Sequence, residues 1–272
     1  IAHEGGGNMD RALVLDWFEE LLHNTATKIF HNAMYDVSWI RSMGFQINGG
    51  IVDTMVAASL IDENRFSYTL DSISKDYIGM RKNEKVLKEA AKEWNRNPKA
   101  EMWKLPAPFV GEYAEQDAEM TLKLWHALQH ELTKQELWDV FNLESNLFPC
   151  LIDMKFKGVR VDIAKAQATK TQLTLTEGKL LRDIKKMVGF DVEIWAAVSI
   201  AKAFEKVNLP YDRTEKGAPS FTKNFLATHP AELPKLINQA REINKANTTF
   251  IDTIIKHEYK GRIHADINQI RS

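Results

Sequence analysis

A strand pattern that runs directly into a helix pattern, twice in succession, restricts the fold of this chain more than any other feature. Residues 28–31 form a short strand segment that leads into Asn32, and apolar residues at helical spacing follow over residues 35–43. Residues 51–52 repeat the strand signal, and a second helix pattern follows over residues 54–61, with Asp53 as its expected cap. Strands that alternate with helices predict an α/β unit, and with only two such strand segments its sheet is expected to lack its first strands.

Helix patterns dominate the rest of the chain. They are predicted over residues 70–77, 112–132, 136–156, 163–188, 194–207 and 233–255, and the first two are separated by a polar stretch over residues 85–94 and a loop that contains Pro98, Pro106 and Pro108. We place a domain boundary around residues 134–150, which gives an α/β domain over residues 1–133 and a mainly helical domain over residues 134–272. Within the second domain the remaining predictions are a brief strand at 159–162, a loop at 213–220 and a strand without a partner at 261–266.

The two halves differ in charge, although the whole chain carries a net charge of only -1. Residues 1–150 contain 15 Lys and Arg against 23 Asp and Glu, whereas residues 151–272 contain 21 against 14. An acidic half suits cation binding and a basic half suits a polyanionic partner. Two solvated surfaces of different composition explain the difference equally well.

Other features of the composition restrict the class of protein. No apolar run is long enough to span a bilayer, and the N-terminus lacks the basic and apolar regions of a signal peptide, so we expect a cytoplasmic protein. The single cysteine, Cys150, cannot form an internal disulfide. Because it lies in an apolar helix pattern, it is predicted to be a buried structural thiol rather than a nucleophile.

Two short motifs each place a carboxylate close to a phenol. The first is Asn32-Ala-Met-Tyr-Asp36 at a step from strand to helix, and the second is Tyr113-Ala-Glu-Gln-Asp117 early in a later helix. Tyr113 and Asp117 are one helical turn apart and share a face. Converging carboxylates suit Mg²⁺, and two such ions about 4 Å apart can activate water and neutralise the leaving oxygen of a phosphodiester. A phenol beside them can hold the attacking water.

Each motif is weak by itself, because a Tyr and an Asp one turn apart more often mark an exposed helix face. The conjunction of both motifs, in this order and in an acidic α/β half, is what favours a metal-dependent site. In the basic half, Lys223, Lys235, Arg241 and Lys245 lie on or before one predicted helix. Such a row suits phosphate contacts, although Glu242 lies among these residues and a solvated helix face explains it nearly as well.

The motifs and their order resemble the A-family DNA polymerases of bacteriophage and bacterial type. The first half is similar to their 3′-5′ proofreading exonuclease domain at Ile1-Ala2-His3, Asn32 to Asp36, residues 51–55, residues 68–72, and Tyr113 to Asp117. The second half is similar to their thumb and the start of their palm at Glu144 and at residues 157–162, 217–220, 241–245 and 261–264. The resemblance spans essentially the whole chain. It implies an α/β exonuclease domain of ribonuclease H-like type, with a truncated sheet, followed by a mainly α-helical thumb.

The resemblance also implies roles for the matched residues. The metal ligands and the phenol that orients water would be Asp36, Asp117 and Tyr113, with Asn32 and Asp53 in support and two Mg²⁺ or Mn²⁺ ions in the complete site. The residues expected to contact the primer–template backbone are Lys223, Arg241 and Lys245. The implied partners are a single-stranded DNA 3′ end, a primer–template duplex and replication accessory proteins, in a bacterial or phage-infected cell.

Two departures from the family pattern limit what the chain itself is expected to do. The family carries an Asp-x-Glu pair on an early exonuclease strand, and no pair here takes that place. Asp117 and Glu119 diverge on a helix, and Asp191-Val-Glu193 lies in the other half. The palm motifs that hold the polymerase carboxylates are also absent. We therefore expect the parent polymerase to polymerise and proofread, and this chain alone to be inactive.

Two alternatives from other classes fit parts of the sequence. One is a non-catalytic DNA-binding module that has a degenerate exonuclease fold and uses only its basic half. The other is a stand-alone 3′-5′ exonuclease of the RNA-processing type, which shares both motifs but does not predict the thumb-like second half.

Overall fold

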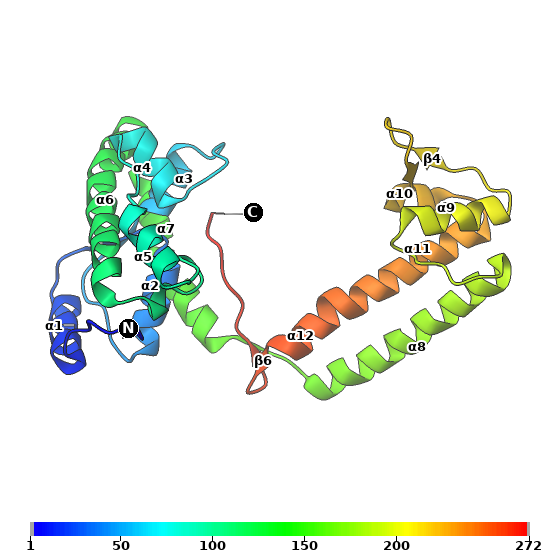
Figure 1. Cartoon of the computed structure of the whole chain (residues 1–272), viewed down its shortest axis with the longest axis horizontal. Coiled ribbons are helices and arrows are strands. Elements are labelled where there is room, and N and C mark those ends of the chain that lie inside the picture. The colour runs from blue at the N-terminus through cyan, green and yellow to red at the C-terminus, as the bar shows by residue number, and fades with distance from the viewer. Residues whose placement is uncertain (1–2, 271–272) are drawn as a thin grey trace. The chain divides into compact units, whose positions relative to one another are not determined.

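The computed structural model describes residues 3–270 and divides the chain into two compact units, Ile1–Phe156 with Asp266–Ser272, and Lys157–Ala265. Figure 1 labels the helices of both units and some of their strands. Ile1 and Ala2, the first residues of the family segments, lie outside the described residues. No helix within residues 3–270 is both long and apolar enough to cross a membrane.

The first unit contains both predicted steps from strand to helix. Its elements in chain order are α1 (Arg11–His23), β1 (Lys28–Phe30), α2 (Ala33–Ser42), β2 (Ile51–Asp53), α3 (Thr54–Ile61), α4 (Leu70–Ile78), α5 (Lys85–Glu93), a 3₁₀ turn (Met102–Lys104), α6 (Ala107–Lys134) and α7 (Trp138–Lys157). β1 and β2 pair in parallel with Lys28 opposite Ile51 and Phe30 opposite Asp53. Both strands therefore deliver their helices at the same edge of the sheet.

The long helix α6 is the central packing element of the first unit. It contacts α3, α4, α5 and β1. It buries Met120, Leu124, Leu128 and Leu132, whose four-residue spacing places them on one face. The helix begins at Ala107, earlier than predicted, because prolines at its cap and in its first turn sit where a backbone N–H has no partner within the helix.

The N-terminal loop packs onto the segment that leads into α6. The Glu4 N–H donates to the Trp103 carbonyl over 3.0 Å, and the Ala107 N–H donates to the Gly6 carbonyl over 2.9 Å. A Cβ on Gly5 would lie 2.4 Å from the Pro106 nitrogen, so this close approach requires glycine.

The prediction that Cys150 is buried was wrong, because its side chain is exposed. The buried residues of α7 are Phe141, Phe148 and Ile152. Cys150 lies two positions from both Phe148 and Ile152, which on a helix places it on the opposite face. The apolar neighbours Phe148 and Ile152 are themselves buried, but they do not bury the cysteine.

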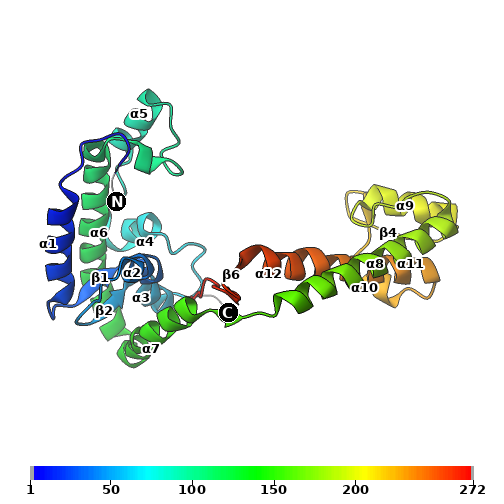
Figure 2. The same cartoon turned by 90° about the horizontal axis from the view of Figure 1, so that it is seen from below.

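The second unit is mainly helical. Its helices are α8 (Ile163–Val188), α9 (Ala197–Lys206), α10 (Lys223–Thr228), α11 (Glu232–Lys245), a π-helical segment (Ala246–Ile251) and α12 (Asp252–His257). α8 and α11 pack side by side, as both Figure 1 and Figure 2 show. The core of this unit includes Ile184, Phe204 and Ile237, and the Phe204 and Phe221 rings lie 4.9 Å apart.

Short antiparallel pairings complete the second unit. The predicted loop at residues 213–220 contains the hairpin of β4 (Asp212–Arg213) and β5 (Pro219–Ser220). The prediction that residues 261–266 form a strand without a partner was wrong, because β7 (Arg262–Ile263) pairs with both β3 (Val159–Arg160) and β6 (Glu258–Tyr259). The two turn residues before β7 both have positive φ, 51° and 77°, as a tight hairpin requires.

Candidate active site

One carboxylate, that of Asp53, fixes both steps from strand to helix. Its Oδ1 accepts from the Asn32 N–H over 2.9 Å and from the Met55 N–H over 2.8 Å, and its Oδ2 accepts from the Ala33 N–H over 2.7 Å. Asp53 therefore caps α3, as predicted, and also satisfies the first amides of α2. Burial raises the pKa of Asp53, while these backbone hydrogen bonds oppose that rise.

Asn32 supports the site through its backbone conformation. It is the N-cap residue of α2 and has left-handed dihedral angles, φ 67° and ψ 57°, which asparagine tolerates better than most residues. Its side chain makes no capping bond and is exposed. The turn at Asn32 lets β1 end and α2 begin within two residues, and this places Asp36 in the first turn of α2.

Asp36 is partly buried close to the Asp53 carboxylate. Burial raises the pKa of Asp36 to about 6, and repulsion from Asp53 adds to the effect. A carboxylate in such a position is stabilised in its charged form by a nearby cation. Strongly shifted carboxyl groups concentrate at functional sites, which is consistent with the role predicted for Asp36.

The second motif forms one group with a lysine that the sequence did not single out. The Lys82 ammonium lies 2.7 Å from Asp117 Oδ2 and 3.0 Å from the Tyr113 hydroxyl oxygen. The ammonium is also 5.0 Å from the centre of the Tyr113 ring, in cation–π geometry. Tyr113 and Asp117 thus share a helix face, as predicted, and Lys82 joins their functional atoms.

The loop between α4 and α5 holds Lys82 in place. The Lys82 N–H donates to Asp71 Oδ1 over 2.8 Å, and the Asn83 N–H donates to Gln116 Oε1 over 2.6 Å. Gln116 belongs to the second motif, so that motif also anchors the loop that carries the lysine. No local pattern in the sequence signals this contact, because Lys82 and Asp117 are far apart in the chain.

The structure forms two groups of candidate residues. Asn32, Asp36 and Asp53 form one, and Tyr113 and Asp117 form the other with Lys82. Within residues 3–270 no hydrogen bond joins Asp36 to Asp117. Burial lowers the pKa of the nearby His31 to about 4, and the positive charge of Lys82 contributes to this shift.

The described residues fit part of a metal site. Asp117 Oδ1 is buried and has no hydrogen-bond partner, as expected for an oxygen reserved for a cation. However, no cluster of three or more His, Cys, Asp or Glu side chains suited to a metal ion occurs within residues 3–270. Asp36 and Asp117 can therefore each supply a ligand, while the described residues do not bring together the larger donor set of a two-metal site.

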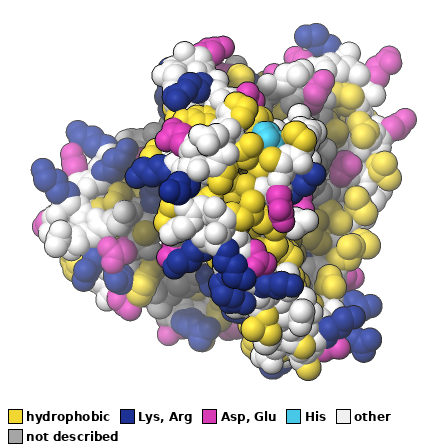
Figure 3. Space-filling model, turned by 90° about the vertical axis from the view of Figure 1, so that its right-hand side faces the viewer, with side chains coloured by type: hydrophobic (Ala, Val, Ile, Leu, Met, Phe, Trp, Pro, Cys, Tyr) yellow, Lys and Arg dark blue, Asp and Glu magenta, His cyan; other side chains and the backbone are white. Residues whose placement is uncertain are grey.

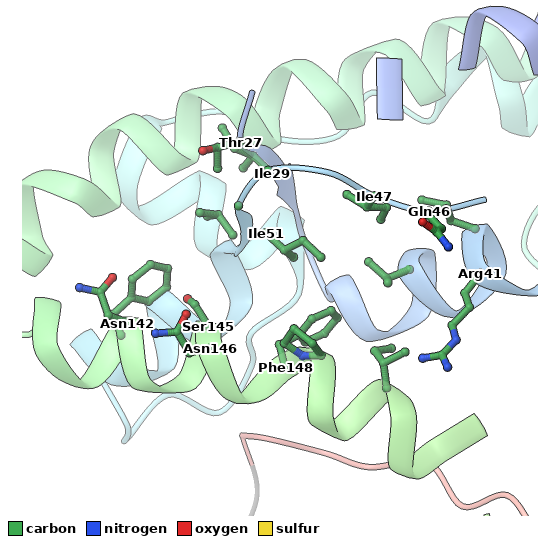
Figure 4. A pocket seen from close by; sticks show the side chains of 18 of the residues that line it. Thr27, Ile29, Arg41, Gln46, Ile47, Ile51, Asn142, Ser145, Asn146 and Phe148 are labelled. Carbon is green, nitrogen blue, oxygen red and sulfur yellow. The ribbon is translucent and has the colours of Figure 1, made fainter. Parts of the chain in front are cut away.

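Three pockets of the first unit differ in their relation to these residues. The largest, about 960 Å³, is lined by β1, β2, α2 and α7 and contains none of the candidate catalytic side chains (Figure 4). A pocket of about 310 Å³ includes Asn32, Asp53 and residues 266–270. A third, of about 590 Å³, includes Lys82 and Tyr113.

The three basic residues predicted to contact DNA have different environments. Arg241 donates to the carbonyls of Ile194 and Phe221 over 2.6 and 2.8 Å, so two of its guanidinium donors serve the fold. Lys223 forms an exposed ion pair with Glu242 at 3.2 Å. Lys245 is exposed at the end of α11. Lys and Arg side chains occur in several separate groups over the face shown in Figure 3.

Comparisons with known proteins find one matching domain family and several similar polymerases. Residues 7–133 match the family model of the 3′-5′ exonuclease domain of A-family DNA polymerases. The chain is 31% identical to a DNA-directed DNA polymerase of Pseudomonas phage M6, over 100% of the chain and 42% of that protein. It is 28% identical to DNA polymerase DpoZ of Acinetobacter phage SH-Ab 15497, over 94% of the chain and 45% of that protein. The chain is 26% identical to DNA polymerase I of Pseudomonas aeruginosa, over 99% of the chain and 31% of that protein.

A solved structure extends the likeness to both units. The POL domain of Pol1 from M. smegmatis, in complex with DNA primer-template and dNTP, matches 97% of this chain and 44% of that one with a TM-score of 0.74. At 18% identity this likeness shows the fold alone. The first unit therefore has the ribonuclease H-like exonuclease fold, followed by a helical region, as predicted.

The comparisons assign residues 7–133 to the 3′-5′ exonuclease domain of A-family DNA polymerases, and the whole chain is similar in sequence to phage and bacterial DNA polymerases. It spans less than half the length of the phage relatives it matches. Members of this family depend on divalent metal ions in that domain, and the unpartnered oxygen of Asp117 agrees with this requirement.

Proposed function

We propose that residues 1–133 form the proofreading exonuclease of a DNA polymerase and that residues 134–272 form its thumb and the start of its palm. The substrate of the first part is a single-stranded DNA 3′ end, and the partner of the second is primer–template duplex, in the cytoplasm of a bacterial or phage-infected cell. The observation that carries the proposal is the group of Tyr113, Asp117 and Lys82, which places a phenol and a carboxylate with an unsatisfied oxygen on one helix face.

Each residue of the proposed site has a defined task. Asp36 and Asp117 hold Mg²⁺ or Mn²⁺, two ions in the complete site, which supply charge neutralisation and a more acidic water. The Tyr113 hydroxyl orients the attacking water, because its oxygen accepts from Lys82 while its O–H is free to donate to that water. Asp53 and Asn32 keep Asp36 at the start of α2.

The test is hydrolysis of a 3′-labelled single-stranded oligonucleotide by the full-length polypeptide that the gene encodes, with and without Mg²⁺. Asp117→Asn and Asp36→Asn are each expected to lower the rate on the order of 10²–10³-fold, because each removes charge stabilisation that acts on the transition state. Tyr113→Phe is expected to lower it on the order of 10²-fold. Glu119→Gln is the matched control, since this exposed residue of the same helix forms an ion pair with Lys123.

Two outcomes would count against the proposal. Equal rates in the Asp117→Asn variant and the Glu119→Gln control would remove Asp117 from the site. An intact substrate at all Mg²⁺ concentrations, together with retained DNA binding, would instead favour a non-catalytic DNA-binding module.

A further inference from the structure

A cationic pocket opens beside Tyr113 in the first unit. It has a volume of about 590 Å³ and lies between the loop that carries Lys82, helix α5 and the segment around residues 98–102. Its size falls within the range of about 300–1,000 Å³ that is typical of small-molecule sites. The four basic residues that line it are Arg81, Lys82, Lys88 and Lys99.

The pocket has more positive charge than its carboxylates neutralise. Lys82 is paired with Asp117 at 2.7 Å, and Lys88 is paired with Glu84 at 2.7 Å. Within residues 3–270, Arg81 and Lys99 form no ion pair. The surrounding segment, residues 75–104, holds nine Lys and Arg against five Asp and Glu, although residues 1–150 as a whole are acidic. The local excess of cations therefore suits an anion from outside.

Besides the four cations, the lining contains the carboxylates of Asp71 and Glu84, the hydroxyl of Thr69, and a group of apolar and aromatic side chains. The apolar and aromatic part of the lining consists of Leu70, Leu87, Pro98, Met102 and Tyr113. Leu87 belongs to the small core cluster against which Tyr113 packs. A wall of this kind suits the flat, weakly polar surface of a base or sugar, while the cations suit a phosphate. The combination fits a nucleotide better than it fits an inorganic anion.

We propose that this pocket binds a nucleotide phosphate next to Tyr113, with Arg81 and Lys99 as the residues that contact it. The proposal rests on the proposed function, because it deepens the substrate contacts of the same site. Two sources share this chemistry, namely a backbone phosphate of the DNA strand and the 5′-phosphate of a released mononucleotide. Lys82 lies at the boundary of the pocket and the catalytic group, so a ligand in the pocket lies next to the proposed reacting centre.

The test compares two double variants that remove the same charge. Arg81→Gln with Lys99→Gln removes the two unpaired cations of the pocket, whereas Lys92→Gln with Arg96→Gln removes two exposed cations of the same segment that do not line it. All four side chains are exposed, so neither variant is expected to change the fold. Binding is measured by fluorescence anisotropy with a 5′-labelled oligo(dT), in EDTA so that no cleavage occurs, over a series of salt concentrations.

The pocket variant is expected to bind the oligonucleotide about tenfold more weakly than the control. The slope of log affinity against log salt concentration is expected to fall by about 0.7 for each phosphate that the variant no longer neutralises. Titration with dTMP separates the two sources: loss of dTMP binding with unchanged oligonucleotide binding assigns the pocket to the released product, and the reverse assigns it to the strand.

Equal binding of both ligands by the two double variants would overturn the proposal, and so would a wild-type protein that binds neither ligand. This outcome can be told apart from failure of the proposed function, because binding in EDTA needs neither metal nor catalysis. If the protein does not hydrolyse DNA, and oligonucleotide binding is lost only in the pocket variant, the pocket proposal is supported and the nuclease proposal is contradicted.

Discussion

The two units hold their functional candidates in different ways. In the first unit the carboxylates of Asp36, Asp53 and Asp117 are partly buried, and backbone amides or a lysine fix the positions of the last two. In the second unit Lys223 and Lys245 lie on exposed helix surfaces. The difference reflects two kinds of task. Chemistry at a single phosphodiester needs fixed atoms, whereas a grip on a polyanion needs mainly positive charge within reach.

Substitution of Asp53 should give the largest loss of stability. Asp53→Ala removes hydrogen bonds from the N-termini of two helices and is expected to lower the free energy of unfolding by about 2–4 kcal/mol. Asp10→Ala removes the single capping bond of the exposed helix α1 and should cost about 1 kcal/mol. Chemical denaturation of both variants measures the difference. Equal losses would mean that Asp53 supports only one helix.

Arg241 should behave as a structural residue of the second unit. Arg241→Ala leaves the carbonyls of Ile194 and Phe221 without their donor and is expected to cost about 2 kcal/mol of stability. Lys235→Ala, on the same helix and exposed, should change stability by less than about 0.5 kcal/mol. A stable Arg241→Ala protein with a specific loss of duplex binding would instead show that Arg241 serves DNA, as the family resemblance implied.

Asp36 should destabilise the first unit at neutral pH. Its folded-state pKa of about 6 lies above its ordinary value of 3.8, so the native state binds more protons and stability falls as pH rises from about 4 to 6. Asp36→Asn is therefore expected to raise the free energy of unfolding by about 1–3 kcal/mol at pH 7–8 and to leave it nearly unchanged below pH 4. Thermal unfolding across pH measures this. The control is Asp16→Asn, which changes an exposed carboxylate. The same pH dependence in both variants would show that the effect is not specific to Asp36.

Lys245 should give the smallest change in stability and a measurable change in binding. Lys245→Ala is expected to alter the free energy of unfolding by less than about 0.5 kcal/mol, because the side chain is exposed. The slope of log affinity for duplex DNA against log salt should fall by about 0.9, the value for a single phosphate on duplex DNA. An unchanged slope would mean that Lys245 is a solvent-exposed residue that does not contact DNA.

The sequence predicted the local steps of the fold well. Both strand-to-helix steps follow from short apolar segments next to residues that cap helices, and the Asp53 cap was expected from its position alone. The start of α6 was placed too late, because prolines were interpreted as loop residues although they are compatible with a first helical turn. The exposure of Cys150 was missed because a mixed helix can present one residue to solvent between two buried neighbours.

The contacts in the candidate site between residues far apart in the chain could not be predicted from the sequence. Lys82 meets Asp117 and Tyr113 only after the loop between α4 and α5 folds onto α6, and no spacing rule connects such positions. The same holds for β7, whose partners β3 and β6 are set by packing within the second unit. The structural task of Arg241 was hidden because its carbonyl partners lie in distant loops. The motifs therefore indicated candidate residues, but they did not predict what each of these residues contacts.

The most direct measurement is a Mg²⁺ titration of mononucleotide release from a 3′-labelled single-stranded oligonucleotide, with the full-length polypeptide and its Asp117→Asn variant side by side. If Asp117 holds a catalytic metal ion, release requires Mg²⁺ and falls on the order of 10²–10³-fold in the variant, with oligonucleotide affinity retained. Release that is independent of Mg²⁺, or equal in the two proteins, would contradict a metal-dependent proofreading site at Asp117.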